Sequence, residues 1–76
     1  MKEGLLWFDN DPGRKLADKI GQAAKRYQVR FGRRPTTCYL NPADFVDQAE
    51  VVNGIHLRPK GNVQRYHLWI GVETVN

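Results

Sequence analysis

Apolar residues recur every three or four positions between Asp11 and Gly32, which is the spacing of an amphipathic helix. Asp11-Pro12 is a typical helix start, because Asp accepts free backbone N–H groups and Pro fits the first helical position. Gly32 fits the left-handed residue that ends a helix, and Pro35 prevents continuation. We predict a helix of about 19 residues between these signals. Its core-facing stripe contains Leu16, Ala17, Ile20, Ala23, Ala24, Tyr27 and Phe31.

Short runs on both sides of this helix have the composition of β-strands. Residues 5–8 are apolar at every position, which predicts a central strand covered on both faces. Residues 36–40 are rich in β-branched and aromatic side chains and end at Asn41-Pro42, a second helix start. We expect a short helix over about residues 42–49. Its buried side would contain Phe45, Val46 and Ala49.

The C-terminal part predicts two hairpins. Asn53-Gly54 is a typical two-residue hairpin turn. A turn over residues 59–62 would form the second hairpin, with Arg58 opposite Val63 and Ile55 opposite Tyr66. Because opposed residues share a face, this register separates two kinds of side chain. One face would contain Ile55, Leu57, Tyr66, Leu68, Ile70 and Val72, and the other His56, Arg58, Arg65, His67 and Trp69.

These elements predict an α/β (α+β) fold with two layers and the order β-α-β-(short α)-β-β. One long helix would pack on one face of a mixed sheet of about four to five strands. The first two strands should be parallel, as neighbours or one strand apart, with a right-handed crossover. We expect residues 1–76 to form a single small globular domain. The second sheet face would then be solvated, closed by a second copy of the chain, or used for binding.

Length and cysteine content exclude several classes of protein. A chain of 76 residues is too short for an enzyme with two lobes or a deep enclosed cavity. Its one cysteine, Cys38, excludes a disulfide scaffold and a cysteine zinc knot, and favours a reducing cytoplasm. The apolar run at residues 5–8 is too short for a signal peptide or a membrane span. We expect a cytoplasmic protein that does not bind membranes.

The net charge of +4 is concentrated in one segment. Residues 14–34 carry eight basic side chains and one acidic one, a net charge of +7, so the rest of the chain sums to −3. The helical wheel places Lys15, Lys19, Arg26 and Arg30 along one flank, and Arg33 and Arg34 follow the helix. This basic stripe is either a solvated face or a surface for an anionic partner. Its like-charge pairs four positions apart each destabilise a helix by roughly 0.2–0.5 kcal/mol.

The second sheet face combines cations with aromatic rings, as do sheets that bind single-stranded nucleic acid. We therefore predict a small non-catalytic module that binds nucleic acid or another polyanion. The candidate contact residues are Lys15, Lys19, Arg26, Arg30, Arg33, Arg34, His56, Arg58, Arg65, His67 and Trp69. The alternative is a protein–protein adaptor or homodimer that buries the same sheet face against its partner.

Catalytic and metal sites receive less support. Asp9 and Asp11 follow the first strand, where carboxylates can bind Mg²⁺ or act in catalysis, so a Mg²⁺-dependent phosphodiesterase using Asp9 is a second alternative. Helix capping explains the same carboxylates. In the second hairpin, His56 and His67 would lie diagonally, about 7–8 Å apart and without a third ligand, so we expect no metal there. No cofactor or catalytic residue is predicted, and whether the chain is an enzyme stays open.

Two resemblances follow, one from short motifs and one from a first strand that ends in Asp and is followed by a basic helix. The motifs are Trp7-Phe8-Asp9-Asn10-Asp11-Pro12, Phe31-Gly32-Arg33-Arg34-Pro35, Cys38 with Asn41-Pro42, and residues 67–73. With them, nearly the whole chain resembles a group of short bacterial proteins with no assigned function, which implies a stand-alone domain. Residues 5–40 also resemble the small subunit of the CRISPR spacer-integration complex, a ferredoxin-like endonuclease relative. That resemblance implies a metal-facing Asp9, although this helix is longer than in that family and residues 66–73 do not fit its second half.

Overall fold

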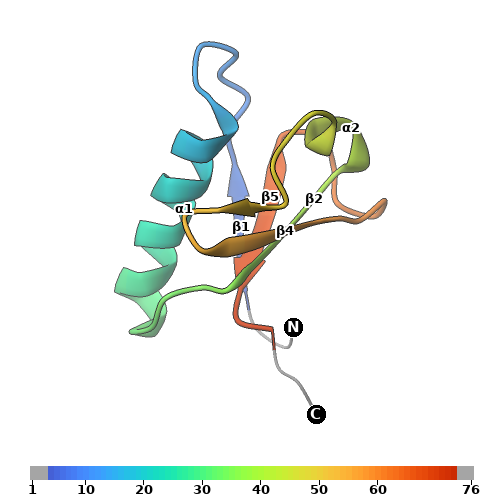
Figure 1. Ribbon diagram of the computed structural model, residues 1–76. Helices are drawn as coiled ribbons and strands as arrows, with labels where there is room; N and C mark the ends of the chain where they lie inside the picture. Colours follow the sequence, from blue (N-terminus) through green and yellow to red (C-terminus); the bar gives the residue numbers. More distant parts are fainter. Residues whose placement is uncertain (1–3, 74–76) are drawn as a thin grey trace.

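The computed structural model describes residues 4–73. Within them, two helices and five strands follow in the order β1 (Leu5–Phe8), α1 (Leu16–Phe31), β2 (Thr37–Leu40), α2 (Pro42–Phe45), β3 (Val51–Val52), β4 (Ile55–Pro59) and β5 (His67–Gly71). The strands form one mixed sheet in the order β1-β5-β2-β4-β3, and α1 packs on one of its faces (Figure 1). The predicted α+β class, with one long and one short helix, is confirmed.

Helix α1 buries three residues of the predicted stripe and partly buries three more, but it begins later than predicted. Ile20, Ala23 and Tyr27 are buried, whereas Ala17 is exposed. The predicted stop is confirmed, since Gly32 has a φ of 75° and its N–H donates to the carbonyl of Gln28. The predicted start is wrong: the carboxylate of Asp11 accepts the N–H of Gly13 at 2.9 Å in a local turn, and the helix begins at Leu16 without a side-chain cap.

Strand β1 lies at an edge of the sheet, so its predicted central position is wrong. Leu5 and Trp7 pack against the core, while Leu6 and Phe8 are 56 % and 55 % exposed. The continuous apolar run therefore supplies one buried face and one apolar surface. Both β1 and β2 run antiparallel to β5, which separates them, so the predicted parallel pair one strand apart is confirmed.

The second predicted hairpin does not form. Strand β5 lies between β1 and β2, with Ile70 paired to both Leu5 and Cys38, and β4 pairs in parallel with β2. In this arrangement the apolar strand β5 has a neighbouring strand on each side. Leu68 and Ile70 are only 4 % and 0 % exposed, and burial of their apolar surface favours folding. The Asn53-Gly54 hairpin between β3 and β4 is confirmed by the pairing of these strands.

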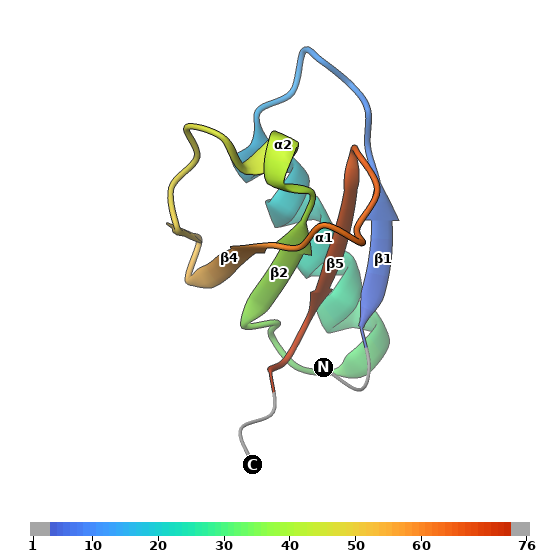
Figure 2. The same ribbon diagram turned by 90° about the vertical axis from the view of Figure 1, so that its right-hand side faces the viewer.

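The predicted sorting of side chains between the two faces is largely correct. Ile55, Leu57, Leu68, Ile70, Cys38 and Leu40 are buried in the core beneath α1. Across the described strands, the opposite face carries Leu6, Phe8, Tyr39, His56, Arg58, His67 and Trp69, and no helix covers it (Figure 2). We call it the open face. Alternation depends on the pleat of each strand rather than on its neighbour, so the sorting does not require the hairpin. Tyr66 is an exception, because it precedes β5 and is 47 % exposed.

Helix α2 is shorter than predicted. Asn41 caps it as expected, since its side-chain oxygen accepts the N–H of Ala43 at 2.8 Å. Phe45 packs against the core, but Val46 is 64 % exposed and Ala49 is also exposed. Asp47 has a φ of 62°, a conformation that interrupts a right-handed helix. Neither helix in the described part of the chain is long and apolar enough to span a membrane.

Candidate nucleic-acid interface

Trp69 occupies the middle of the open face. It pairs in register with Leu6 of β1 and Tyr39 of β2. A Cβ added at Gly4 would lie 2.9 Å from Cε2 and Cζ2 of the Trp69 ring, so the ring rests against the backbone of Gly4. Because Gly4 has no side chain, the Trp69 ring can pack directly on the backbone that precedes β1. The role of Gly4 could not be predicted, because a single glycine before a strand carries no signal of which side chain packs on it.

A hollow of about 390 Å³ opens beside Trp69. Leu6, His67 and Trp69 line it from the sheet, and Lys60, Asn62, Val63 and Gln64 line it from the connection between β4 and β5. Its volume lies at the lower end of the range for small-ligand sites, about 300–1,000 Å³. The hollow combines an aromatic surface with one cation and two amide side chains.

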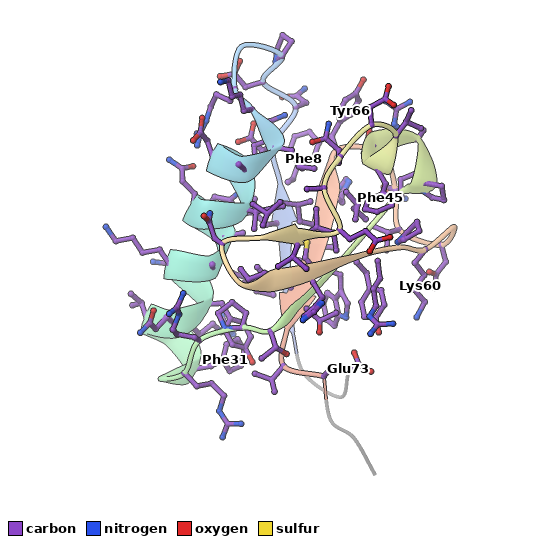
Figure 3. All side chains as sticks on the ribbon, viewed as in Figure 1. Phe8, Phe31, Phe45, Lys60, Tyr66 and Glu73 are labelled. Atoms are coloured by element: carbon purple, nitrogen blue, oxygen red, sulfur yellow. The ribbon has the colours of Figure 1, made fainter. Side chains whose placement is uncertain are left out.

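Tyr39 extends the aromatic surface toward β4. Its hydroxyl donates to Oε2 of Glu73 at 2.7 Å, and this hydrogen bond raises the pKa of Tyr39. The ammonium of Lys60 lies 5.0 Å from the centroid of the Tyr39 ring, a cation–π contact. Lys60 and Glu73 both lie on the side of the sheet away from α1 (Figure 3). The Tyr39 ring is therefore held between a cation over its face and a carboxylate at its hydroxyl.

His67 and Phe8 form the aromatic group nearest the β1 edge. Their ring centroids are 4.9 Å apart with the planes tilted by 47°. Nδ1 of His67 lies 2.9 Å from the carbonyl oxygen of Arg65. Because a carbonyl oxygen can only accept, Nδ1 carries the proton of this bond. The hydrogen bond fixes the His67 ring beside Phe8.

Arg65, predicted on the second sheet face, lies outside the strands and pairs with Asp44. It precedes β5, and its Nε donates to Oδ1 of Asp44 at 2.7 Å, which raises the pKa of Arg65. The other oxygen of Asp44 accepts the N–H of Tyr66 at 2.7 Å. Tyr66 has a φ of 65°, so Asp44 holds an unusual backbone turn where the chain enters β5.

The predicted basic stripe on α1 is not part of the open face. Lys15, Lys19, Arg26 and Arg30 belong to the helix layer, on the other side of the sheet. Lys19 is engaged there, because its Nζ donates to the carbonyl of Asp9 at 3.2 Å. Arg30 lies 5.7 Å from the centroid of the Phe31 ring. Arg33 and Arg34 are exposed in the connection that follows α1. The structure thus divides the predicted site residues between two surfaces.

Asp9 is surrounded by cations. Its carboxylate lies 3.6 Å from Nη1 of Arg14 and 3.9 Å from Nζ of Lys19, and it accepts the N–H of Asp11 at 3.0 Å. These two cations would compete with a metal ion for the Asp9 carboxylate. Across residues 4–73, no group of three or more His, Cys, Asp and Glu residues could hold a metal ion.

The diagonal pair of His56 and His67 is absent, because the two histidines lie on β4 and β5 with β2 between these strands.

Cys38 belongs to the core. It is fully buried on β2, and burial raises the pKa of its thiol to about 12. A neutral, inaccessible thiol is a poor nucleophile and a poor metal ligand. Cys38 therefore contributes packing.

Comparisons of this chain with protein-family models, with curated proteins and with solved structures find no match. The two resemblances noted from the sequence stay expectations.

Proposed function

We propose that this chain binds single-stranded nucleic acid on the open face, as a small module without catalytic activity. The observation that carries the proposal is the hollow beside Trp69, where an aromatic floor meets the amides and the cation of the β4–β5 connection. A base stacked against Trp69 would gain about 1–3 kcal/mol. The amides of Asn62 and Gln64 offer hydrogen bonds to base edges.

The cations of the open face favour a partner with a phosphate backbone. Arg58 pairs in register with Tyr39, and Lys60 lies over the Tyr39 ring. We expect a strand with one base at Trp69 to continue over the Tyr39 ring toward these two cations, and away from the Glu73 carboxylate at the Tyr39 hydroxyl. We place this activity in the cytoplasm, where a single buried cysteine remains reduced.

The test is the affinity of the protein for a labelled mixed-sequence oligonucleotide, measured by fluorescence anisotropy at about 50 and 200 mM salt. We expect the single strand to bind more tightly than its duplex, and binding to weaken with salt. Trp69→Ala should weaken binding at least tenfold, because it removes a stacking surface. Arg58→Gln combined with Lys60→Gln should flatten the salt dependence.

The matched control is Arg26→Gln combined with Arg30→Gln, which removes the same charge from the helix layer. We expect it to leave affinity within about threefold of the wild type. A larger loss in this control than in Trp69→Ala would place the interface on α1 and contradict the proposal. Absence of single-strand binding at about 50 mM salt would contradict it as well.

A homodimer or adaptor remains the second candidate, on the basis of the exposed apolar side chains of β1. Leu6 and Phe8 are more than half exposed at an edge of the sheet. Edge strands of this kind pair readily with other chains. Light scattering over a concentration series tests this candidate: a dimer that Phe8→Ser dissociates supports it, and a monomer at all concentrations excludes the homodimer.

A further inference from the structure

A second hollow lies on the helix side of the sheet, between the middle of α1 and the turn that joins β3 to β4. Figure 1 shows this turn beside α1. The hollow has a volume of about 450 Å³. Its polar lining comes from three separate segments: Lys25 and Gln28 of α1, Arg34 of the connection to β2, and Asn53 of the turn. The fold, rather than one charged run, brings these side chains together.

All four polar side chains can donate hydrogen bonds, and two of them are cations. The lining contributed by the described residues contains no acidic side chain. Within residues 4–73, no hydrogen bond or ion pair engages the side chains of Lys25, Gln28, Arg34 or Asn53. Lys19, on the other flank of α1, differs because Asp9 pairs with it. Two cations that share a hollow without a counter-charge repel each other, and a bound anion would relieve that repulsion.

Gly21 and Asn53 define how closely the helix and the turn approach. Asn53 and Gly54 have φ angles of 52° and 77°, the left-handed conformations of a tight two-residue hairpin turn. The atom nearest to a Cβ added at Gly21 would be Nδ2 of Asn53, at 3.8 Å. The amide of Asn53 therefore stands over the helix at Gly21, at one end of the hollow.

The part of this surface that lacks an acidic side chain ends near Asn53. A neighbouring, more open depression continues along α1 from Gly21, Lys25 and Asn53, but its lining includes Asp18. Arg14 also lines this depression, and its Nη1 donates a hydrogen bond to Oε1 of Gln22 at 2.8 Å. A long polyanion lying along the helix would meet this carboxylate, so the hollow is suited to a short anionic group.

We propose that this hollow binds a phosphate group, carried either by a small polyphosphate or by the end of a nucleic acid. The guanidinium of Arg34 matches two phosphate oxygens at once, and the ammonium of Lys25 adds a compact charge. The amides of Gln28 and Asn53 supply neutral donors for the remaining oxygens. The site lies on the opposite side of the sheet from Trp69 and does not depend on the proposed function of the open face.

The test is a titration of the ¹⁵N-labelled protein with inorganic diphosphate, followed by amide chemical shifts. We expect saturable shifts at Gly21, Lys25 and Asn53. Lys25→Gln combined with Arg34→Gln should weaken binding at least tenfold. Asn53→Asp should do the same, because it keeps a residue that tolerates positive φ and places a carboxylate against the ligand. An unchanged thermal midpoint in Asn53→Asp would show that the turn is intact.

The matched control for this site is again Arg26→Gln combined with Arg30→Gln. It should leave diphosphate affinity within twofold, and equal weakening by both pairs would mean diffuse attraction and overturn the proposal. The absence of saturable shifts would also overturn it. Trp69→Ala should not affect diphosphate binding, so failure at one surface is distinguishable from failure at the other.

The two sources of phosphate can be separated by competition. A short oligonucleotide with a 5′-phosphate that displaces diphosphate, while its 5′-hydroxyl form does not, identifies a nucleic-acid end. Tighter binding of tripolyphosphate with no displacement by either oligonucleotide identifies a small polyphosphate.

Discussion

The two faces of the sheet are built from the same strands but differ in almost every physical property. Under α1, alternate residues such as Cys38, Leu57 and Ile70 are at most 4 % exposed. On the open face, their neighbours in the chain are Tyr39, Arg58 and Trp69, which are only partly buried or exposed. One face thus provides the stability of the fold, and the other face carries aromatic and charged groups that the core does not need.

This difference follows from the small size of the domain. With one long helix, the chain can exclude water from one face only. Apolar side chains on the other face, such as Leu6 and Phe8 at more than half exposure, gain little from folding. These two side chains are the apolar groups on which the homodimer candidate rests.

The largest expected effect comes from making one substitution on each face. Leu68→Ala should lower the free energy of unfolding by about 3 kcal/mol, because it opens a cavity in the core. Leu6→Ala, on the neighbouring strand, should lower it by less than about 1 kcal/mol, because this side chain is 56 % exposed. Urea denaturation measures both values. Equal losses of unfolding free energy in the two variants would contradict the claim that only the face under α1 stabilises the fold.

A smaller effect is expected where the chain enters β5. Asp44→Ala should lower the free energy of unfolding by about 1–2 kcal/mol, because the N–H of Tyr66 loses its carboxylate acceptor. It should also shift the amide signals of residues 60–67, which border the hollow beside Trp69. Glu50→Ala, an exposed acidic residue, serves as the control and should change stability by less than about 0.5 kcal/mol. Comparable effects of the two substitutions would contradict a supporting role for Asp44.

The smallest stability effect concerns the pH dependence of the core. Because burial raises the pKa of Cys38 from 9.0 to about 12, the unfolded chain loses this proton first as pH rises. Stability should therefore fall from about pH 9 toward pH 12, by about 1 kcal/mol at pH 10 from this thiol. Cys38→Ala should show a shallower decline between pH 8 and about pH 10 in urea denaturation. Parallel pH profiles would contradict a buried neutral thiol.

Local patterns in the sequence predicted the elements and the sorting of faces, whereas pairing between strands was harder to predict. The end of α1 at Gly32, the cap at Asn41 and the turn at Asn53-Gly54 each depend on a few adjacent residues. The position of β5 between β1 and β2 depends on contacts across most of the chain. A run of four apolar residues looks the same at an edge as in the centre, so the position of β1 could not be predicted.

The candidate site shows the same limit. Trp69, His67, Arg58 and His56 were predicted to share a face, and they do. The roles of Gly4, Lys60 and the donors around Asn53 could not be predicted, because they depend on side chains brought together from distant segments. The position of Arg65 outside the strands could not be predicted for the same reason, since its partner Asp44 lies 21 positions away.

The most direct test of the open face uses the two tryptophans, which lie on opposite faces of the sheet. Trp7 packs against the core and Trp69 lies beside the hollow. In Trp7→Phe, where Trp69 is the remaining tryptophan, a mixed-sequence single strand should quench the emission saturably, and about 500 mM salt should reverse the effect. In Trp69→Phe, the emission of Trp7 should not change. Two results would contradict binding on the open face: emission that is quenched in Trp69→Phe but not in Trp7→Phe, or no quenching in Trp7→Phe at about 50 mM salt.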